Sequence, residues 1–460
     1  MKNSRKRSII LLLLVLSFFS GMIFLITKFS TNAEKWAFKP YNLHLSLNSF
    51  ADAGRIYDTN STVLAESIDG KRIYNEDSQI RKAVFHLVGD ESFNISTSIQ
   101  NKFRDKLFGY NFLSGIDLPS FLRKKSDVYL NVDSKLCKLA LSELKDHKGA
   151  VALYNYKTGE VLCMVSTPTL DIKNLPNDIS SNKNKDYDAV FLNKILSANF
   201  VPGSIFKLVT AICTFENIPK EALEKTFECK GKEIVENEKI TCAGYHGKIG
   251  LKEGLKESCN IVLGNFAMTL GKNNMIRTAE KLCFNKPIKT DIGETKESYF
   301  NLSDANKASV AWSGIGQYKN LVNPLHMLTI VGAIANEGVA VMPKIIKENK
   351  NNFLNHRKSK NSEENCIRYT TKDVANKVKE MMSYTAKSSI FYKFHNFNTC
   401  LKTGTAEVGG EKKPHAWVTG FLQNEKHPVA FIVLVENAGS GFEEAVPIAA
   451  KLLKEVTKET

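Results

Sequence analysis

The sequence predicts an α/β fold in which a five-stranded, mainly antiparallel sheet lies between helices. Two strand-like segments occur early in the main body of the chain, three more occur close to its C-terminus, and helical patterns separate the two groups. This order closes one sheet from both ends of a domain. An N-terminal membrane helix and a small α+β region precede it. The 460 residues, 43% hydrophobic and 24% charged, suit a globular protein of two or three domains and exclude disorder.

The chain is basic, because 63 Lys and Arg residues outnumber 48 Asp and Glu residues and give a net charge of +15. Neither an arginine-rich helix nor a zinc-finger spacing accompanies this charge, so we expect no nucleic-acid partner. A basic protein also suits contact with an anionic cell envelope.

An uncharged, apolar run from Ser8 to Thr27 is long enough to span a hydrocarbon core of about 30 Å. Basic residues precede it at positions 2, 5, 6 and 7. The positive-inside rule therefore predicts a single pass through the cell membrane, with a cytoplasmic N-terminus and an extracellular body from Lys28 onward. A cleaved signal peptide is the alternative, but the run exceeds the ~7–15 residues of a signal-peptide core.

Alternating apolar residues and turn signals predict the strands. Gly149–Tyr156 and Glu160–Ser166 are joined by the tight turn Lys157-Thr158-Gly159. Before them, residues 48–125 contain short alternating segments, including a hairpin with its turn at Asn60-Ser61. The other predicted elements are the strands Asn398–Thr405, His415–Leu422 and Val429–Glu436, the helices Ser134–Leu144, Ser204–Phe215 and Glu443–Val456, and the polar surface segments Asn177–Asp188 and Ile346–Glu364.

Serine followed three residues later by lysine on a helix places both side chains on one face. An unprotonated amine can then take the hydroxyl proton as the oxygen attacks an acyl carbon. Only Ser204, paired with Lys207, has a Pro-Gly lead-in and an apolar helix behind it, which predicts a buried Lys207 with a pKa lowered toward neutrality. The same spacing occurs in two polar segments, at Ser142/Lys145 and Ser180/Lys183.

Two further short motifs accompany this pair. The first is Ser258-Cys259-Asn260, and the second is Lys402-Thr403-Gly404-Thr405, on a predicted edge strand where we expect the Lys402 ammonium to meet a carboxylate. Neither is specific alone, because Ser46-Leu47-Asn48 and Lys157-Thr158-Gly159 match the same patterns. The order S-x-x-K, S-x-N, K-T-G along the chain is the active-site set of penicillin-binding proteins and serine β-lactamases.

The resemblance extends beyond these motifs. The segment from Val128 to Val456 is similar to the transpeptidase domains of class B penicillin-binding proteins, including those like penicillin-binding protein A. It implies the fold shared by penicillin-binding transpeptidases and serine β-lactamases. The resemblance is carried by Pro202–Lys207, Gly314–Gln317, Asn323–Leu325, Ala335–Gly338, Lys402–Glu407 and His415–Trp417.

The resemblance implies a peptidoglycan DD-transpeptidase that needs no cofactor for catalysis. Ser204 would attack the penultimate D-Ala carbonyl of a stem peptide, and the amine of a neighbouring stem would resolve the acyl-enzyme. β-Lactams mimic that donor and would trap Ser204. By the same resemblance, Lys207 would act as the base, Ser258 would relay a proton, and Asn260 would position Lys207 and the substrate amide. Lys402, Thr403 and Thr405, on the strand that carries Gly404, would bind the donor carboxylate. The backbone N–H groups of Ser204 and Thr405 would form the oxyanion hole.

The apolar run predicts a cytoplasmic tail at 1–7 and a transmembrane anchor at 8–27. The resemblance implies an N-terminal pedestal at 28–127 and the transpeptidase domain at 128–460. The pedestal resembles the family less closely. Where the family reads Arg-Gly-x-Ile-x-Asp-Arg-x-Gly, this chain has Ala53, Thr59 and Ser61 in place of the two Arg residues and the last Gly. Because no polymerase domain is predicted, we expect a polytopic glycan polymerase as a partner in the membrane.

Other functions share these motifs. A β-lactamase needs only the catalytic domain and gains little from an anchor and a pedestal. A bifunctional polymerase requires a glycosyltransferase domain, for which the residues before position 128 leave no room. Two alternatives stay open, namely a DD-carboxypeptidase that resolves the acyl-enzyme with water and a non-enzymatic sensor of β-lactams or muropeptides.

Cysteine use indicates a metal site beside the Ser258 motif. The chain has nine cysteines, an odd number, and we expect most of them to be small core residues. Cys229, Cys242, His246 and Cys259 have the spacing Cys-x12-Cys-x3-His-x12-Cys, a candidate set of three thiolates and one imidazole for a structural zinc. The alternatives are a Cys229–Cys242 disulfide and an ordinary buried thiol at Cys259.

Overall fold

The computed structural model describes residues 2–37, 49–109, 125–176, 179, 187–347 and 365–458. The predicted surface segments Asn177–Asp188 and Ile346–Glu364 lie largely outside these residues. The chain forms two compact units. The first comprises Met1–Ile56, Ala65–Tyr74 and Phe103–Val128, and the second comprises Tyr57–Leu64, Asn75–Lys102 and Tyr129–Thr460.

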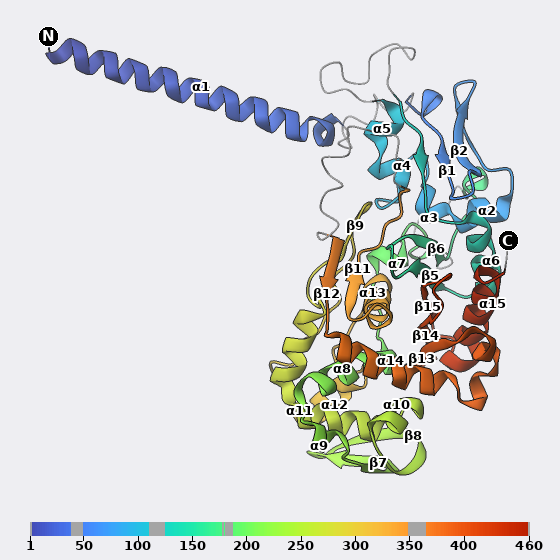
Figure 1. The fold of residues 1–460 in the computed structure, drawn as a ribbon. Coiled ribbons are helices and arrows are strands. Elements are labelled where there is room, and N and C mark those ends of the chain that lie inside the picture. The colour runs from blue at the N-terminus through green and yellow to red at the C-terminus, as the bar shows by residue number, and fades with distance from the viewer. Residues whose placement is uncertain are drawn as a thin grey trace. The chain divides into compact units, whose positions relative to one another are not determined.

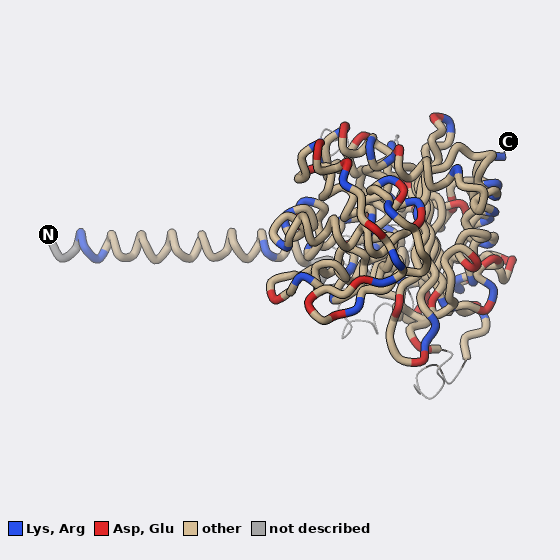
Figure 2. The backbone as a smooth tube through the Cα atoms, turned by 90° about the horizontal axis from the view of Figure 1, so that it is seen from below, with Lys and Arg blue, Asp and Glu red and all other residues tan. Residues whose placement is uncertain are grey.

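The first unit begins with a long helix, α1 (Lys2–Ala37). Figure 2 shows basic residues toward the two ends of this helix and a long uncharged stretch between them. Its part Arg5–Asn32 is long and apolar enough to cross a membrane, judged by length and composition. The predicted apolar helix is therefore present.

The first unit also contains a tight hairpin. Residues Ala65–Ile68 of β2 (Val63–Ile68) pair antiparallel with β3 (Lys71–Tyr74). The two turn residues Asp69 and Gly70 both have positive φ, at +49° and +75°, as two-residue hairpin turns require. Short elements in the same part of the sequence are η2 (Ser49–Asp52), β1 (Ile56–Tyr57), α5 (Arg104–Phe108) and β4 (Val128–Tyr129).

The second unit is built on a five-stranded antiparallel sheet with the order β13-β14-β15-β5-β6 (Figure 1). Two of its strands precede the helices and three follow them, which confirms the predicted topology. All residues of β14 and β15 are buried, so both faces of the sheet are covered, and β13 forms an edge. The strands are β5 (Gly149–Asn155), β6 (Val161–Thr167), β13 (Thr399–Ala406), β14 (His415–Leu422) and β15 (Val429–Val435).

Helices cover both faces of this sheet (Figure 1). The helices α6 (Ser134–Leu144) and α15 (Val446–Val456) pack together on one face, and α13 (Pro324–Ala335) packs on the other. The close approach of α13 requires glycine, because a Cβ atom on Gly332 would lie 1.6 Å from the hydroxyl oxygen of Tyr154.

Further helices surround this core. The described part of the unit contains α2 (Ser78–Ala83), α3 (Phe85–Val88), α4 (Ile99–Lys102), α7 (Lys194–Ser197), α8 (Lys207–Asn217), α9 (Lys220–Leu223), α10 (Leu251–Lys256), α11 (Asn260–Lys281), α12 (Lys307–Gly314), α14 (Lys372–Ala386), η4 (Ile172–Asn174) and η10 (Ser389–Phe397). Short strands pair as β9 (Lys289–Thr290) with β10 (Gly293–Glu294) and β11 (Val339–Val341) with β12 (Cys366–Arg368).

Two predicted helices begin with a different kind of turn. The predicted helix Ser204–Phe215 starts as the 3-10 helix η7 (Gly203–Phe206) and continues as α8. The predicted closing helix starts as a π-helical turn, η11 (Gly441–Ala445), before α15. A proline in the first turn of α15 explains the second boundary, because proline is well suited to a helix start.

A long two-stranded hairpin was not predicted from the sequence. It consists of β7 (Phe227–Val235) and β8 (Glu238–Ile249), which pair with each other and with no other strand in the described part of the chain. The turn residues Glu236 and Asn237 both have positive φ, at +46° and +69°. A turn of this kind usually carries glycine, so its sequence signal is weak.

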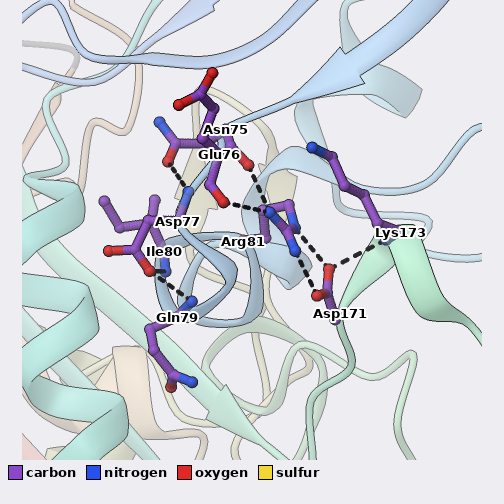
Figure 3. Close-up of polar contacts among 8 residues, drawn as sticks. All are labelled: Asn75, Glu76, Asp77, Gln79, Ile80, Arg81, Asp171 and Lys173. Atoms are coloured by element: carbon purple, nitrogen blue, oxygen red, sulfur yellow. Dashed lines mark hydrogen bonds and ion pairs between the residues drawn. The ribbon is translucent and has the colours of Figure 1, made fainter.

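A buried ion pair joins α2 to the segment that follows β6 (Figure 3). The Arg81 guanidinium donates two hydrogen bonds of 2.6 Å to the carboxylate of Asp171, and Nη1 donates to the carbonyls of Asn75 and Glu76 at 2.8 Å. Only 7% of the Arg81 side chain and 9% of the Asp171 side chain are exposed. The hydrogen bonds from Arg81 hold the pKa of Asp171 below its usual value.

The substitution Arg81→Ala is expected to lower the free energy of unfolding by about 3 kcal/mol, because it leaves the Asp171 carboxylate buried without its partner. Chemical denaturation measures this loss. Lys173→Ala is the matched control, since its side chain is exposed while its backbone N–H still donates to Asp171. A loss in Arg81→Ala no larger than that of the control would contradict the prediction.

Candidate active site

Ser204 lies where backbone segments from distant parts of the sequence meet. A Cβ atom on the preceding Gly203, whose φ is +52°, would lie 2.6 Å from the carbonyl oxygen of Thr405 and 2.8 Å from Cα of Ala406. The Gly203 N–H also donates to the carbonyl of Gly316 at 3.0 Å. Only glycine permits both the close approach to β13 and the positive φ. Ser204 therefore lies in the first turn of its helix, beside β13.

The side chain of Lys207 is buried under this turn, as predicted, with no exposed surface. Its Nζ donates to the Ser258 carbonyl at 2.5 Å, to Asn260 Oδ1 at 2.7 Å and to Ser258 Oγ at 3.1 Å. Burial lowers the pKa of Lys207 to about 7. An amine that titrates near neutrality can be unprotonated and accept a proton from a nearby hydroxyl group.

Ser258 lies between two lysines. Its Oγ accepts one hydrogen bond from Lys207 Nζ and another, of 2.9 Å, from Lys402 Nζ. Because both acceptor positions of the hydroxyl are filled, its own hydrogen is directed elsewhere. Ser258 also has a φ of +53°, a left-handed conformation that costs a residue other than glycine on the order of 1 kcal/mol. The contacts around Ser258 therefore hold it in this conformation.

Lys402 is more buried than a residue on an edge strand usually is. Only 1% of Lys402 is exposed, so it is not a solvated surface lysine. Its Nζ donates to Ser258 Oγ and to the carbonyl of Thr403 at 2.9 Å. Burial first, and the nearby Lys207 charge second, lower the pKa of Lys402.

The reason is the alternation of side chains along β13. Lys402 and Gly404 face the turn that carries Ser204, since a Cβ atom on Gly404 would lie 3.0 Å from Ile205 Cγ2. Thr405 lies on the other face of the strand, where its Oγ1 accepts from the N–H of Gly441 at 3.5 Å. The strand is an edge in its hydrogen bonding, while one of its faces is covered.

The motif residues and their copies lie in different settings. Hydrogen bonds join Lys207, Ser258, Asn260 and Lys402, while Ser204 lies one turn before Lys207, and Thr403, Gly404 and Thr405 follow Lys402 on β13. Ser142 lies on α6, and Lys145 follows the end of that helix with a φ of +50°. Lys157-Thr158-Gly159 is the turn between β5 and β6. The copies Ser46-Leu47-Asn48 and Ser180/Lys183 lie outside the described residues.

Asn260 is held by the hairpin strand β8. Its backbone N–H donates to Cys242 Sγ at 3.3 Å, and its Nδ2 donates to the carbonyl of Thr241 at 2.8 Å. With both of these bonds made, Oδ1 is left facing Lys207. The position of the hairpin therefore determines where the Lys207 amine is held.

The predicted cysteine and histidine cluster is confirmed as a possible metal-binding group. One ligand atom from each of Cys229, Cys242, His246 and Cys259 lies within 4.8 Å of all the others. His246 Nδ1 lies 3.4 Å from Cys229 Sγ and 3.6 Å from Cys242 Sγ, and the sulfur atoms of Cys242 and Cys259 are 3.9 Å apart. No disulfide joins Cys229 and Cys242, since both are free thiols.

The cluster favours a negative charge on sulfur. The hydrogen bond between the sulfur atoms of Cys242 and Cys259 lowers the pKa of Cys242 to about 4 and raises the pKa of Cys259. A thiolate is the form in which cysteine binds a metal ion.

Two supports of the site were missed by sequence reasoning. The Trp417 indole N–H donates to the carbonyl of Val201 at 3.1 Å and so fixes the chain ahead of Ser204. The His-Ala-Trp motif carries a signal for this contact. The Thr241 contact with Asn260 is made by a backbone carbonyl, which leaves no signal in the sequence.

The comparison with protein families identifies one domain. The model described as "Penicillin binding protein transpeptidase domain" matches residues 149–454. Among curated relatives, the peptidoglycan D,D-transpeptidase PbpA of Mycolicibacterium smegmatis is 24% identical over 68% of this chain and 67% of that protein. The peptidoglycan D,D-transpeptidase FtsI of Buchnera aphidicola is 23% identical over 75% of this chain and 60% of that protein. Penicillin-binding protein 3 of Bacillus subtilis is 25% identical over 67% of this chain and 47% of that protein.

The chain thus spans about half to two thirds of the length of these curated relatives. Solved structures share its fold. Penicillin-binding protein A from Mycobacterium tuberculosis, as a ceftriaxone acyl-enzyme complex, is 20% identical with a TM-score of 0.75 and covers 90% of this chain and 100% of that one. Because the family model covers most of the second unit, and the site has the family's motifs in one place, the chain belongs to the penicillin-binding protein transpeptidase family.

Proposed function

We propose that this protein is a serine-type peptidoglycan D,D-transpeptidase that cross-links stem peptides through an acyl-enzyme on Ser204. The observation that carries the proposal is the buried Lys207 amine, held by Ser258 and Asn260 one helical turn after Ser204. The names of the curated relatives and the acyl-enzyme complexes of penicillin-binding protein A support the same chemistry.

In the acylation step, Ser204 Oγ forms a bond to the penultimate D-Ala carbonyl carbon of the donor stem. The neutral Lys207 amine takes the hydroxyl proton as this bond forms. The C–N bond to the terminal D-Ala then breaks, and the departing amine receives a proton through Ser258. The double hydrogen bond that Ser258 Oγ accepts from Lys207 and Lys402 suits this relay, because it turns the hydroxyl hydrogen away from both lysines.

The donor's terminal carboxylate binds along β13, at the half-buried Thr403 and the exposed Thr405. Lys402 lies on the covered face of the strand and acts on this carboxylate through Ser258, to whose hydroxyl it donates. The backbone N–H groups of Ser204 and Thr405 stabilise the oxyanion, and the loss of one such donor raises the barrier by about 3 kcal/mol. β-Lactams carry the same carbonyl and carboxylate and acylate the same oxygen.

The helix α1 anchors the enzyme in the cell membrane, with residues 1–7 in the cytoplasm and 8–27 across the bilayer. The basic residues ahead of the apolar run favour this orientation, which makes the body extracellular. The segments 28–127 and 128–460 then serve as pedestal and transpeptidase domain. A polytopic glycan polymerase in the same membrane supplies the strands that this enzyme cross-links.

Cys229, Cys242, His246 and Cys259 would hold a structural zinc ion. A tetrahedral zinc with bonds of about 2.3 Å to sulfur and about 2.0 Å to nitrogen separates its ligand atoms by roughly 3.5–3.8 Å. Three of the six distances between these atoms, 3.4, 3.6 and 3.9 Å, are close to those values, and all six lie within 4.8 Å. The ion would fix β8 against the start of α11 and so support Asn260, while catalysis itself uses no cofactor.

Labelled penicillin is expected to attach to Ser204, so that Ser204→Ala abolishes the adduct while the protein stays folded. Intact mass measurement after incubation detects the adduct. Ser142→Ala is the control, because it removes the serine of a competing S-x-x-K copy and should label like the parent. An adduct that persists in Ser204→Ala refutes the assignment.

The rate constant of acylation is expected to rise with pH through about 7 and to level off above it. The reason is that only the unprotonated Lys207 amine accepts the serine proton, and burial lowers the pKa of this amine to about 7. Stopped-flow measurement with a chromogenic β-lactam between pH 5 and pH 9 gives the profile. A rate that keeps rising toward pH 10, the ordinary range of lysine, is the contrary result.

Protein purified without chelator is expected to contain about one equivalent of zinc, and Cys242→Ser should lose it and acylate more slowly. Metal analysis and penicillin labelling provide the two readouts. Cys366→Ser is the control, because Cys366 is exposed on β12 and outside the cluster. A parent free of metal, with two thiols lost to oxidation, would support the disulfide instead.

A further inference from the structure

The β7–β8 hairpin has two faces of different chemistry. Side chains alternate along both strands, so that one face packs against α11 and α12 and the other faces solvent. The inner face carries the cysteine and histidine cluster. The outer face takes no part in the site described above.

Acidic side chains near the end of the hairpin are engaged by the protein itself. Glu233 accepts from Asn265 Nδ2 at 2.6 Å, and Glu236 accepts from the backbone N–H of Lys307 at 2.8 Å. Glu238 accepts from the side-chain amide of Asn306 at 3.3 Å. Three of the negative charges of the hairpin are therefore directed toward α11 and α12.

The outer face is basic and carries two exposed apolar side chains. Lys230 pairs with Glu228 at 2.9 Å, but Lys232 and Lys239 have no acidic partner among the described residues. On the same face 85% of Tyr245 and 72% of Ile234 are exposed. An exposed tyrosine ring beside lysines without acidic partners can bind a ligand that is both anionic and partly apolar.

This outer face reaches the active site. Thr241, whose carbonyl holds Asn260, is the cross-strand partner of Lys232, and Tyr245 is the partner of Lys230. The outer face therefore starts at the Asn260 side of the site, whereas the donor strand β13 contacts the Ser258 side through Lys402. Two peptides could bind the site from different elements.

We propose that the outer face of the β7–β8 hairpin binds the acceptor stem peptide, through its carboxylates at Lys232 and Lys239 and its apolar atoms at Tyr245. The proposal rests on the transpeptidase function proposed above. After the terminal D-Ala has left, the rest of the donor stem stays bound to Ser204 beside β13, so the proposal gives the acceptor a separate surface. Stem peptides carry free carboxylates, and their charge is complementary to unpaired lysines.

The reaction that this surface serves is aminolysis. The acceptor amine nitrogen forms a bond to the acyl carbon, the bond from that carbon to Ser204 Oγ breaks, and the proton lost by the amine passes to the serine oxygen. The hairpin takes no part in these bond changes. It acts by raising the occupancy of the acceptor near the acyl-enzyme, which is an effect on KM.

The test uses the full-length enzyme, an acyl-D-Ala thioester donor and two acceptors, a stem tetrapeptide with free carboxylates and the same peptide with its carboxylates amidated. The variants are Lys232→Glu/Lys239→Glu and Tyr245→Ala. Lys286→Glu/Lys289→Glu is the matched control, since it reverses two exposed lysines outside the hairpin. Labelled penicillin reports acylation in every variant.

In Lys232→Glu/Lys239→Glu the KM for the carboxylate acceptor should rise about tenfold, because two favourable charge contacts become unfavourable. The kcat, the KM for the amidated acceptor and the rate of penicillin acylation should stay within about twofold of the parent. Tyr245→Ala should raise the KM for both acceptors. Equal KM values for parent and charge-reversal variant overturn the acceptor surface but leave the transpeptidase intact. A parent that only hydrolyses the donor overturns both.

Discussion

The hydrogen bonds of the buried Lys207 amine are the constraint on which the rest of the site depends. A lysine removed from water costs several kcal/mol as an ammonium ion unless acceptors surround it. Here the acceptors are the Ser258 carbonyl and hydroxyl and the Asn260 amide, and they retain the amine while burial lowers its pKa to about 7. Lys402 donates to the same hydroxyl and is also buried, so two positive charges at this hydroxyl would be unfavourable. Burial thus lowers the pKa of both lysines that donate to the Ser258 hydroxyl.

Such an arrangement requires three distant chain segments to meet closely, and glycine makes this possible. A Cβ atom on Gly316 would lie 1.9 Å from the carbonyl oxygen of Gly203, which is too close for any side chain. A Cβ atom on Gly203 would in turn meet β13. The five-stranded sheet sets β13 in place, and the apolar helix α8 sets Lys207 in place. Backbone contacts thus determine where Ser204 lies, and one added methyl group at either glycine would displace it.

Periodicity and motif order predicted much of this from the sequence. The alternation in 149–166 and 399–435 identified the sheet, and the order of three short motifs selected Ser204 among three serine–lysine pairs. The burial of Lys402 could not be predicted, because a strand pattern gives the face of a side chain but not what covers that face. The β7–β8 hairpin was missed for a related reason, since its turn uses Glu236 and Asn237 where a glycine would have marked it.

The same alternation explains how one hairpin can serve two purposes. An isolated two-stranded hairpin is marginally stable in water, so its position needs support from side chains on one face. The inner face supplies this support through the cysteine and histidine cluster and through glutamates that accept from α11 and α12. Every second side chain points to the outer face, which is not needed for this packing. The outer face can therefore carry lysines without disturbing the contacts of the inner face. The contacts that hold Asn260 therefore also fix the distance between this basic surface and the buried amine.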